Sequence, residues 1–220
     1  SVWRGDITTL EADAIVNAAN SALLGCWLPG HHCIDNAIHT FAGVQLRMAC
    51  AALMERQGHA EPTGRVQVTD AYNLPARWVL HTVGPIANGA PTERHRRELA
   101  SCYESCLEAA AACGCRTVAF CCVSTGTFGF PQREAAEIAV GAVRSWLDRH
   151  AGEGADAVGG TRGADGGAAR GVASGSGAAG SANASGPGSS PEAPGAPSGL
   201  KVVFNVFGDE DEAIYHDLLG

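Results

Sequence analysis

Short apolar segments that alternate with longer helical stretches constrain the fold of this chain most strongly. Apolar runs typical of buried strands occupy residues 14–16, 65–69, 78–83, 117–123 and 201–207. Spacing of apolar residues that favours helices occurs over residues 35–57, 94–113, 133–150 and 211–219, and a helix-then-strand stretch is expected over residues 10–18. Strands interleaved with helices predict an α/β fold, with a mixed, mostly parallel sheet covered on both faces.

One segment, residues 151–199, differs in composition from the rest. It consists mostly of Gly, Ala, Ser and Pro, and it contains no aromatic residue. Because such a segment buries too little apolar surface to offset its ordering entropy, we expect a disordered insertion, with a regulatory or docking role as the less favoured alternative. The apolar run at 201–207 should return to the same sheet. The domain is therefore expected to comprise residues 1–150 and 200–220.

Charge and cysteine content narrow the function classes. The 220 residues carry a net charge of −8 and no basic run, which argues against nucleic-acid binding. No apolar stretch approaches the roughly 18 residues of a membrane-spanning helix, so no membrane association is expected. Nine cysteines without a regular framework indicate a reducing intracellular compartment, cytoplasmic or organellar. We expect a monomer, and the start at Ser1 without Met suggests that the N-terminus is missing.

A loop rich in metal-binding residue types follows the first predicted strand. Cys26, His31 and Cys33 lie close together, next to Pro29 and Gly30. Thiolate and imidazole ligands together favour Zn²⁺, and three protein ligands leave a fourth position for water or substrate. His32 is an alternative to His31 or a fourth ligand. The competing interpretation is a loop of metal-free cysteines and surface histidines.

A glycine-containing loop, residues 123–131, lies between a predicted strand and a helix that starts near Gln132. Gly126 and Gly129 allow the backbone to approach a phosphate closely, and the helix N-terminus favours negative charge. No Lys follows the glycines, so this is not the phosphate loop of an ATP-hydrolysing enzyme. The alternative is an ordinary strand–helix turn.

Polar residues at two further turns suit recognition of a nucleoside. After Gly5, the Asp6 carboxylate can accept the amino group of a base, whereas the alternative is a helix start capped by Thr8 or Thr9. Asn17 and Asn20 offer the donors and acceptors that ribose hydroxyls require. The alternative for them is a polar loop that satisfies its own backbone.

Asp35 follows the Cys/His loop at the predicted start of a helix. A carboxylate beside a metal ligand is suited to orient or deprotonate a nucleophile, although a first-turn acid is also favoured by the helix dipole alone. His39 shares the helix face of Asp35, and we favour a packed, hydrogen-bonded histidine there. Small buried hydrophobes are favoured over a second metal site for the remaining cysteines: Cys50, Cys102, Cys106, Cys113, Cys115, Cys121 and Cys122.

Taken together, residues 4–8, 14–20, 35–43, 81–85 and 124–131 resemble, in family order, the macrodomain, an ADP-ribose-binding module of three α/β/α layers. The resemblance covers nearly all of residues 2–150 and 200–220. The Cys/His loop replaces a glycine run and resembles the zinc-containing branch, whose members are similar to hydrolases that remove mono-ADP-ribose from carboxylate side chains of proteins. The chain departs from the family in three ways: a first strand before Trp3 is expected to be missing, the 151–199 insertion is unusual, and Gly30 stands where some relatives carry Cys.

The resemblance implies a role for each matching residue. Asp6 would bind the adenine amino group, Ile7 would line the adenine pocket and Phe207 would flank it. The diphosphate would be cradled by Ser124, Thr125, Gly126, Thr127, Phe128 and Gly129. Phe130 would pack near the distal ribose, which Asn20 would hydrogen-bond, and Asn20 and Asp35 form the implied catalytic pair. Zn²⁺ on Cys26, His31 and Cys33 would lie over the scissile ester.

The implied activity is zinc-dependent removal of mono-ADP-ribose from modified, Asp- or Glu-linked protein. A non-catalytic reader of ADP-ribose is the alternative, because one fold can host both functions. A third interpretation is a purely structural zinc site. O-acetyl-ADP-ribose, which is also an ester on the distal ribose, is a further substrate to test.

Overall fold

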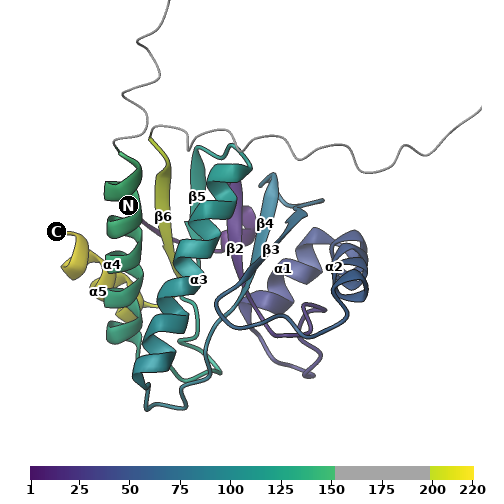
Figure 1. The fold of residues 1–220 in the computed structure, drawn as a ribbon, viewed down its shortest axis with the longest axis horizontal. Coiled ribbons are helices and arrows are strands. Elements are labelled where there is room, and N and C mark those ends of the chain that lie inside the picture. Colours follow the sequence, from purple (N-terminus) through teal and green to yellow (C-terminus); the bar gives the residue numbers. More distant parts are fainter. Residues whose placement is uncertain (152–198) are drawn as a thin grey trace, which may run out of the picture.

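The computed structural model describes residues 1–151 and 199–220, which form a single six-stranded sheet flanked by helices (Figure 1). The strand order is β1-β6-β5-β2-β4-β3. In chain order, the strands are β1 (Val2–Arg4), β2 (Ala14–Ala19), β3 (Val66–Asp70), β4 (Trp78–Val83), β5 (Thr117–Phe120) and β6 (Lys201–Val206). The run predicted at 201–207 therefore lies in the same sheet, where β6 pairs with both β1 and β5.

The sheet is mixed and mostly parallel, as predicted. Each pair of neighbouring strands runs parallel except β3 and β4, which are antiparallel. These two strands follow each other through a short turn, in which the Ala71 amide donates to the Arg77 carbonyl at 3.0 Å. A tight connection of this kind can join only antiparallel neighbours, because parallel strands need a long crossover.

Helices cover both faces of the sheet, which confirms the predicted three-layer arrangement. They are the 3₁₀ helix η1 (Ile7–Thr9) and the α-helices α1 (Ile34–Ala42), α2 (Val44–Gln57), α3 (Glu93–Ala112), α4 (Gln132–His150) and α5 (Asp209–Leu219). Helix α4 packs against α3 and α5, whereas α1 and α2 pack together next to β2 and β3. Strands β2 and β4 are buried almost throughout, as expected for strands covered on both sides.

The prediction of a single helix over residues 35–57 is wrong, because two helices form there. Gly43 separates α1 from α2, whose axes differ in direction by 112°. Gly43 has a φ of 91°, and a Cβ added there would come within 2.7 Å of Asn73. The chain turns there because only glycine fits this conformation at this distance. Among the described residues, no single helix is long and apolar enough to cross a bilayer, and only the bent α1–α2 pair passes that test by length and composition.

Two other expectations differ from the structure. The helix expected from residue 10 does not form, and the short helix η1 covers Ile7–Thr9 instead. The strand expected to be missing before Trp3 is not tested, because β1 itself contains Trp3 at the edge of the sheet. Strand β5 ends at Phe120, so Cys121 and Cys122 follow the strand rather than lie within it. The expected disorder of residues 151–199 falls almost wholly on 152–198, outside the described residues.

Candidate functional site

A cavity of about 1120 Å³ opens beyond the carboxyl ends of the parallel strands. Its walls come from the segments that follow β1, β2, β4, β5 and β6, together with the first turns of α1. All but two of the predicted site residues line it: Asp6, Ile7, Asn20, Cys26, His31, Cys33, Asp35, Ser124, Thr125, Gly126, Thr127, Phe128 and Phe207. Gly129 and Phe130 are not part of the lining, and Phe130 is buried in the core.

Asp6 and Ile7 line the cavity just after the edge strand β1, and Phe207 lines it just after the neighbouring strand β6. Phe207 is 80% exposed, which is unusual for a large apolar side chain. Its ring is therefore free to stack on a flat ligand. The Asp6 carboxylate accepts from the amide and the hydroxyl of Thr8, at 3.0 and 2.7 Å. Asp6 is therefore the N-cap of η1, whereas Thr8 and Thr9 were the predicted caps. Sequence reasoning missed Asn205 and Asp211, which also line the cavity.

The glycine-containing loop lies along the cavity and holds Ser124 in a strained conformation. Ser124 has a φ of 67°, which is uncommon for a residue other than Gly, Asn or Asp. Its hydroxyl is buried and makes no hydrogen bond within the described part of the chain. A Cβ on Gly84 would lie 2.0 Å from this hydroxyl, so only glycine fits at position 84. Strain and an unpaired polar group at one residue are typical of ligand-binding sites.

Cys26, His31 and Cys33, named here the outer cluster, converge in the loop between β2 and α1. Their ligand atoms all lie within 4.8 Å of one another, and the Cys26 Sγ is 3.1 Å from His31 Nδ1. Helix α1 positions Cys33, whose Sγ accepts from the Asn36 amide as the N-cap. The other nitrogen of His31, Nε2, is 3.0 Å from the Thr127 hydroxyl of the glycine-containing loop. His32 is exposed and does not belong to the cluster.

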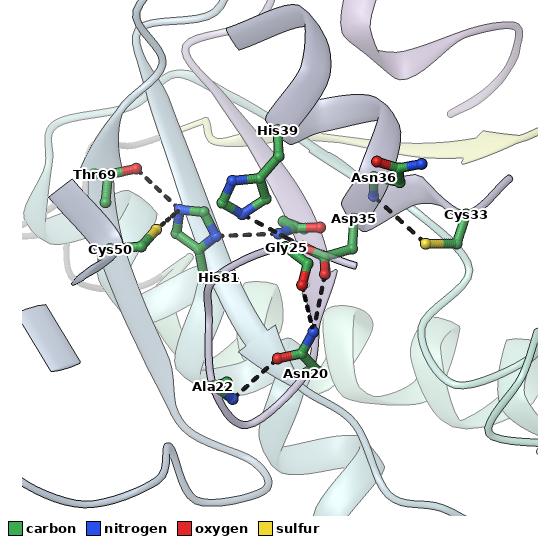
Figure 2. Close-up of polar contacts among 11 residues, drawn as sticks. Asn20, Ala22, Gly25, Cys33, Asp35, Asn36, His39, Cys50, Thr69 and His81 are labelled. Atoms are coloured by element: carbon green, nitrogen blue, oxygen red, sulfur yellow. Dashed lines mark hydrogen bonds and ion pairs between the residues drawn. The ribbon is translucent and has the colours of Figure 1, made fainter. Parts of the chain in front are cut away.

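The Asp35 carboxylate lines the cavity two residues beyond Cys33 and is held by two amides (Figure 2). Its Oδ1 accepts from Asn17 at 2.8 Å, and its Oδ2 accepts from Asn20 at 3.3 Å. Burial raises the pKa of Asp35, although the Asn17 hydrogen bond and the charge of Arg47 oppose this shift. Asp35 is thus a buried carboxylate at the edge of an open cavity, which suits it to bind a hydroxyl or water there.

Asn17 and Asn20 do not act alike. Asn17 is fully buried within β2 and is not part of the cavity lining. Asn20 lines the cavity, but its amide donates to the Gly25 carbonyl and to Asp35, and its oxygen accepts from the Ala22 amide. The contacts with Gly25 and Ala22 match the alternative from the sequence, in which the polar side chains of the loop hydrogen-bond to its own backbone. In these contacts Asn20 fixes the loop and the carboxylate beside it.

Behind Asp35 lies a second group of similar chemistry, named here the inner cluster: His39, Cys50 and His81. All three are buried, and their ligand atoms lie within 4.8 Å of one another. Burial lowers the pKa of His39 to about 4 and that of His81 to about 3. His39 is packed as predicted, but its ring makes no hydrogen bond to any described residue, and its Nε2 is 3.5 Å from Asp35 Oδ1.

Sequence reasoning missed His81, because the inner cluster combines residues from α1, α2 and β4 that are distant in the chain. Within residues 1–151 and 199–220, the outer and inner clusters are the groups whose ligand atoms converge. Of the remaining cysteines, Cys102, Cys106, Cys115 and Cys121 are buried and Cys113 and Cys122 half-buried.

A three-layer α/β/α domain with a ligand cavity at the carboxyl ends of its parallel strands defines a small-molecule-binding α/β module. The Macro domain model matches residues 16–139 of this chain. The chain therefore belongs to the macrodomain family, as the sequence resemblance predicted.

Relatives and solved structures agree with this assignment. The chain is 47% identical over 218 residues to a protein-ADP-ribose hydrolase of Treponema medium, covering 99% of this chain and 66% of the relative. It is 55% identical over 147 residues to a protein-ADP-ribose hydrolase of Staphylococcus aureus strain MSSA476, covering 66% of this chain and 55% of the relative. The Trypanosoma brucei macrodomain in complex with ADP-ribose superposes with a TM-score of 0.69 at 31% identity, covering 100% of this chain and 68% of that one. The chain thus spans between half and two thirds of the two curated relatives.

Proposed function

We propose that this chain is a zinc-dependent ADP-ribosyl hydrolase that removes mono-ADP-ribose from modified Asp or Glu side chains of proteins. One observation carries the proposal: the Asp35 carboxylate and the outer cluster line the same cavity as the glycine-containing loop. A phosphate-binding loop and a reactive centre in one cavity suit a nucleotide-like ligand that is cleaved at one end. Relatives named protein-ADP-ribose hydrolase support the same reaction class.

The glycine-containing loop is suited to the diphosphate of ADP-ribose. Backbone N–H groups of Ser124, Thr125, Gly126, Thr127 and Phe128 would cradle the phosphates, as such groups do in other anion sites. The unpaired Ser124 hydroxyl supports this placement, since a phosphate oxygen would give it a partner. Asp6, Ile7 and Phe207, which also line the cavity, would hold the adenine.

The outer cluster fits zinc by its donor set. Two thiols and one imidazole converge, and thiolate–imidazole sets of three are typical of zinc sites that keep an open position. Burial raises the pKa of the Cys33 thiol, and binding of a metal would release a proton from each thiol ligand. When bound, the ion would supply a Lewis acid for a ribose hydroxyl or water.

Asp35 would orient or deprotonate the hydroxyl or water that attacks the ester. Asn17 and Asn20 hold its two oxygens, so the carboxylate presents a fixed direction to the cavity. In the proposed reaction, water is added across the ester bond between the distal ribose and the protein carboxyl group. Free ADP-ribose and an unmodified Asp or Glu side chain are the products.

One observation favours the second candidate, a module that binds ADP-ribose without cleaving it. Both oxygens of Asp35 already accept hydrogen bonds, and each polar atom of the Asn20 side chain has a partner in the protein. The Asn17 hydrogen bond opposes the rise in the pKa of Asp35 that burial causes, so it makes this carboxylate less ready to take a proton. The two candidates differ in turnover, not in binding.

The test is incubation with a protein that carries mono-ADP-ribose on Asp or Glu, followed by measurement of free ADP-ribose. The wild-type chain should release it, whereas Cys26→Ala and Asp35→Ala should not. His32→Ala is the matched control, because His32 belongs to the same loop but not to the outer cluster, and it should keep wild-type release. Equal release by all four proteins would contradict the zinc mechanism. Binding of ADP-ribose without any release would favour the reader.

A further inference from the structure

A line of buried hydrogen bonds runs from Asp35 away from the cavity and into the sheet (Figure 2). The Asn17 amide nitrogen is 2.8 Å from Asp35 Oδ1 and 3.1 Å from His81 Nδ1. The opposite nitrogen of that ring, Nε2, is 2.9 Å from the Thr69 hydroxyl. The four residues come from α1, β2, β4 and β3, and each is buried. The line thus connects the cavity carboxylate to the far antiparallel strand of the sheet.

The proton positions along this line follow from the donors present. The Asn17 side-chain amide has two hydrogens, and one is donated to Asp35 while the other is donated to His81 Nδ1. Burial holds the pKa of His81 at about 3, so the ring is neutral near pH 7 and carries one proton. With Nδ1 accepting, that proton lies on Nε2, from which it is donated to the Thr69 hydroxyl.

The reverse orientation of Asn17 does not fit these contacts. It would place the amide oxygen 2.8 Å from Asp35 Oδ1, where two acceptors would face each other. The observed orientation leaves only the Asn17 oxygen without a partner among the described residues. Because both hydrogens of Asn17 are used, the amide cannot rotate without breaking its bonds to Asp35 and His81 together.

We propose that Asn17, His81 and Thr69 form a positioning relay that fixes the direction of the Asp35 carboxylate for hydrolysis. The inference rests on the proposed function, in which Asp35 acts on the nucleophile. None of the three lines the cavity, so they act through Asp35 rather than on the ligand. A small displacement of a catalytic group lowers turnover strongly, because the reacting atoms must be aligned before the barrier is crossed.

The relay predicts graded losses of turnover with unchanged substrate binding. Asn17→Leu keeps the side-chain size and removes both donors, and it should lower kcat about 100-fold at an unchanged KM, as expected when a group near the chemistry is misplaced. Thr69→Val removes only the far end of the line and should lower kcat about threefold to tenfold. Thr69→Ser restores the hydroxyl and should restore kcat.

Thr82→Val is the matched control for Thr69→Val. Thr82 is also buried, lies beside His81 on β4, and donates its hydroxyl to the Arg65 carbonyl at 2.7 Å, outside the relay. Both substitutions remove one buried hydroxyl, so both should lower the Tm, but only Thr69→Val should lower kcat. Equal kcat values for the two variants, or no rescue by Thr69→Ser, would overturn the relay.

The state of the His81 ring gives a second readout that needs no turnover. In ¹⁵N-labelled wild-type protein, the imidazole nitrogens of His81 should show a single neutral tautomer with the proton on Nε2. In Thr69→Val the tautomer should stay the same, because Asn17 still donates to Nδ1, but the Nε2 nitrogen and its proton should shift as the hydrogen bond to the hydroxyl is lost. If the wild type released no ADP-ribose, the hydrolase proposal would fail, while the Nε2–H signature would still support the relay. A proton on Nδ1 in the wild type would overturn the relay whatever the activity.

Discussion

The outer and inner clusters contain the same kinds of side chain in opposite surroundings. In each, thiol and imidazole groups lie within 4.8 Å of one another. The outer cluster is half-exposed on a loop that borders the cavity, and its three members are close in sequence. The inner cluster is fully buried and combines residues from α1, α2 and β4.

Burial decides what each cluster can do. In the inner cluster, burial raises the pKa of the Cys50 thiol to about 12 and keeps the two imidazoles neutral. A metal there would need a thiolate that burial disfavours, and His81 already uses both ring nitrogens in hydrogen bonds. In the outer cluster, protons can leave to solvent as a metal enters. The comparison indicates that the outer cluster is the metal site and that the inner cluster supports Asp35 through hydrogen bonds.

Loss of metal should be the largest effect that separates the clusters. The double variant Cys26→Ser, Cys33→Ser should weaken zinc binding by at least about 1000-fold, because thiolate sites bind zinc with about 10–16 kcal/mol and here two of three ligands are lost. Competition with a chromogenic chelator measures this change. Cys50→Ala, the matched removal of an inner thiol, should keep one zinc per chain. Metal loss in Cys50→Ala would reverse the assignment.

The loss of folding stability at low pH should come mainly from the two histidines of the inner cluster. The folded-state pKa values of His39 and His81, about 4 and about 3, lie below the unfolded value of 6.5. The unfolded state therefore binds protons first, and stability is complete above pH 6.5 and is lost as pH falls toward 4. The loss should be about 2 kcal/mol per histidine between pH 7 and pH 5.

Urea unfolding at several pH values checks this loss. His81→Gln should unfold with about half of the wild-type pH dependence, whatever its absolute stability. His32→Asn, a change at an exposed histidine, should keep the wild-type pH dependence. The same pH dependence in His81→Gln and in the wild type would show that the inner histidines do not stay neutral.

A smaller effect should come from the contact that joins the outer cluster to the glycine-containing loop. Thr127→Val removes the hydroxyl 3.0 Å from His31 Nε2. Zinc affinity should fall about tenfold, since loss of an outer partner of a metal-bound histidine costs about 10–100-fold. Thr125→Val, whose hydroxyl donates to the Cys122 carbonyl instead, should leave zinc affinity unchanged. An unchanged zinc affinity in Thr127→Val would show that the Thr127 hydroxyl does not support His31 as a zinc ligand.

The smallest effect should be on the stability of the outer loop. Trp27 is 70% exposed and stacks under Arg47, whose guanidinium carbon is 4.5 Å from the ring centroid. Trp27→Ala should cost about 0.5–1 kcal/mol of unfolding free energy, as expected for an exposed cation–π pair. Chemical denaturation measures it. A loss of several kcal/mol would mean that the outer loop supports the fold as strongly as the inner cluster.

The two clusters also show how much of the site could be predicted from the sequence alone. Cys26, His31 and Cys33 are close in sequence, so their spacing predicted that they converge. His39, Cys50 and His81 meet only because α1, α2 and β4 pack together, and no local pattern encodes that contact. Asn17 shows the same limit, because its motif suggested a ribose contact, whereas its place in the buried strand β2 turns it toward Asp35 and His81.

Turn geometry limited the prediction of elements in a similar way. The strands followed from their apolar runs, and the sheet is of the predicted mixed, mostly parallel kind. The break at Gly43 was missed because helical periodicity continues across it, and glycine is required there by the φ of 91° together with the close approach of Asn73. Asp6 was assigned to adenine binding. In the structure it lines the cavity and also caps η1, so the sequence could not separate a capping residue from a ligand-binding one.

Zinc titration of metal-stripped protein tests the central claim most directly. Release of ADP-ribose from an aspartate-linked mono-ADP-ribosyl protein is followed as zinc is added back to the stripped chain. The account predicts no release without zinc and a linear rise that reaches its plateau at one zinc per chain, in Cys50→Ala as in the wild type. Full release by the stripped chain, or a plateau at two zincs per chain, would contradict it.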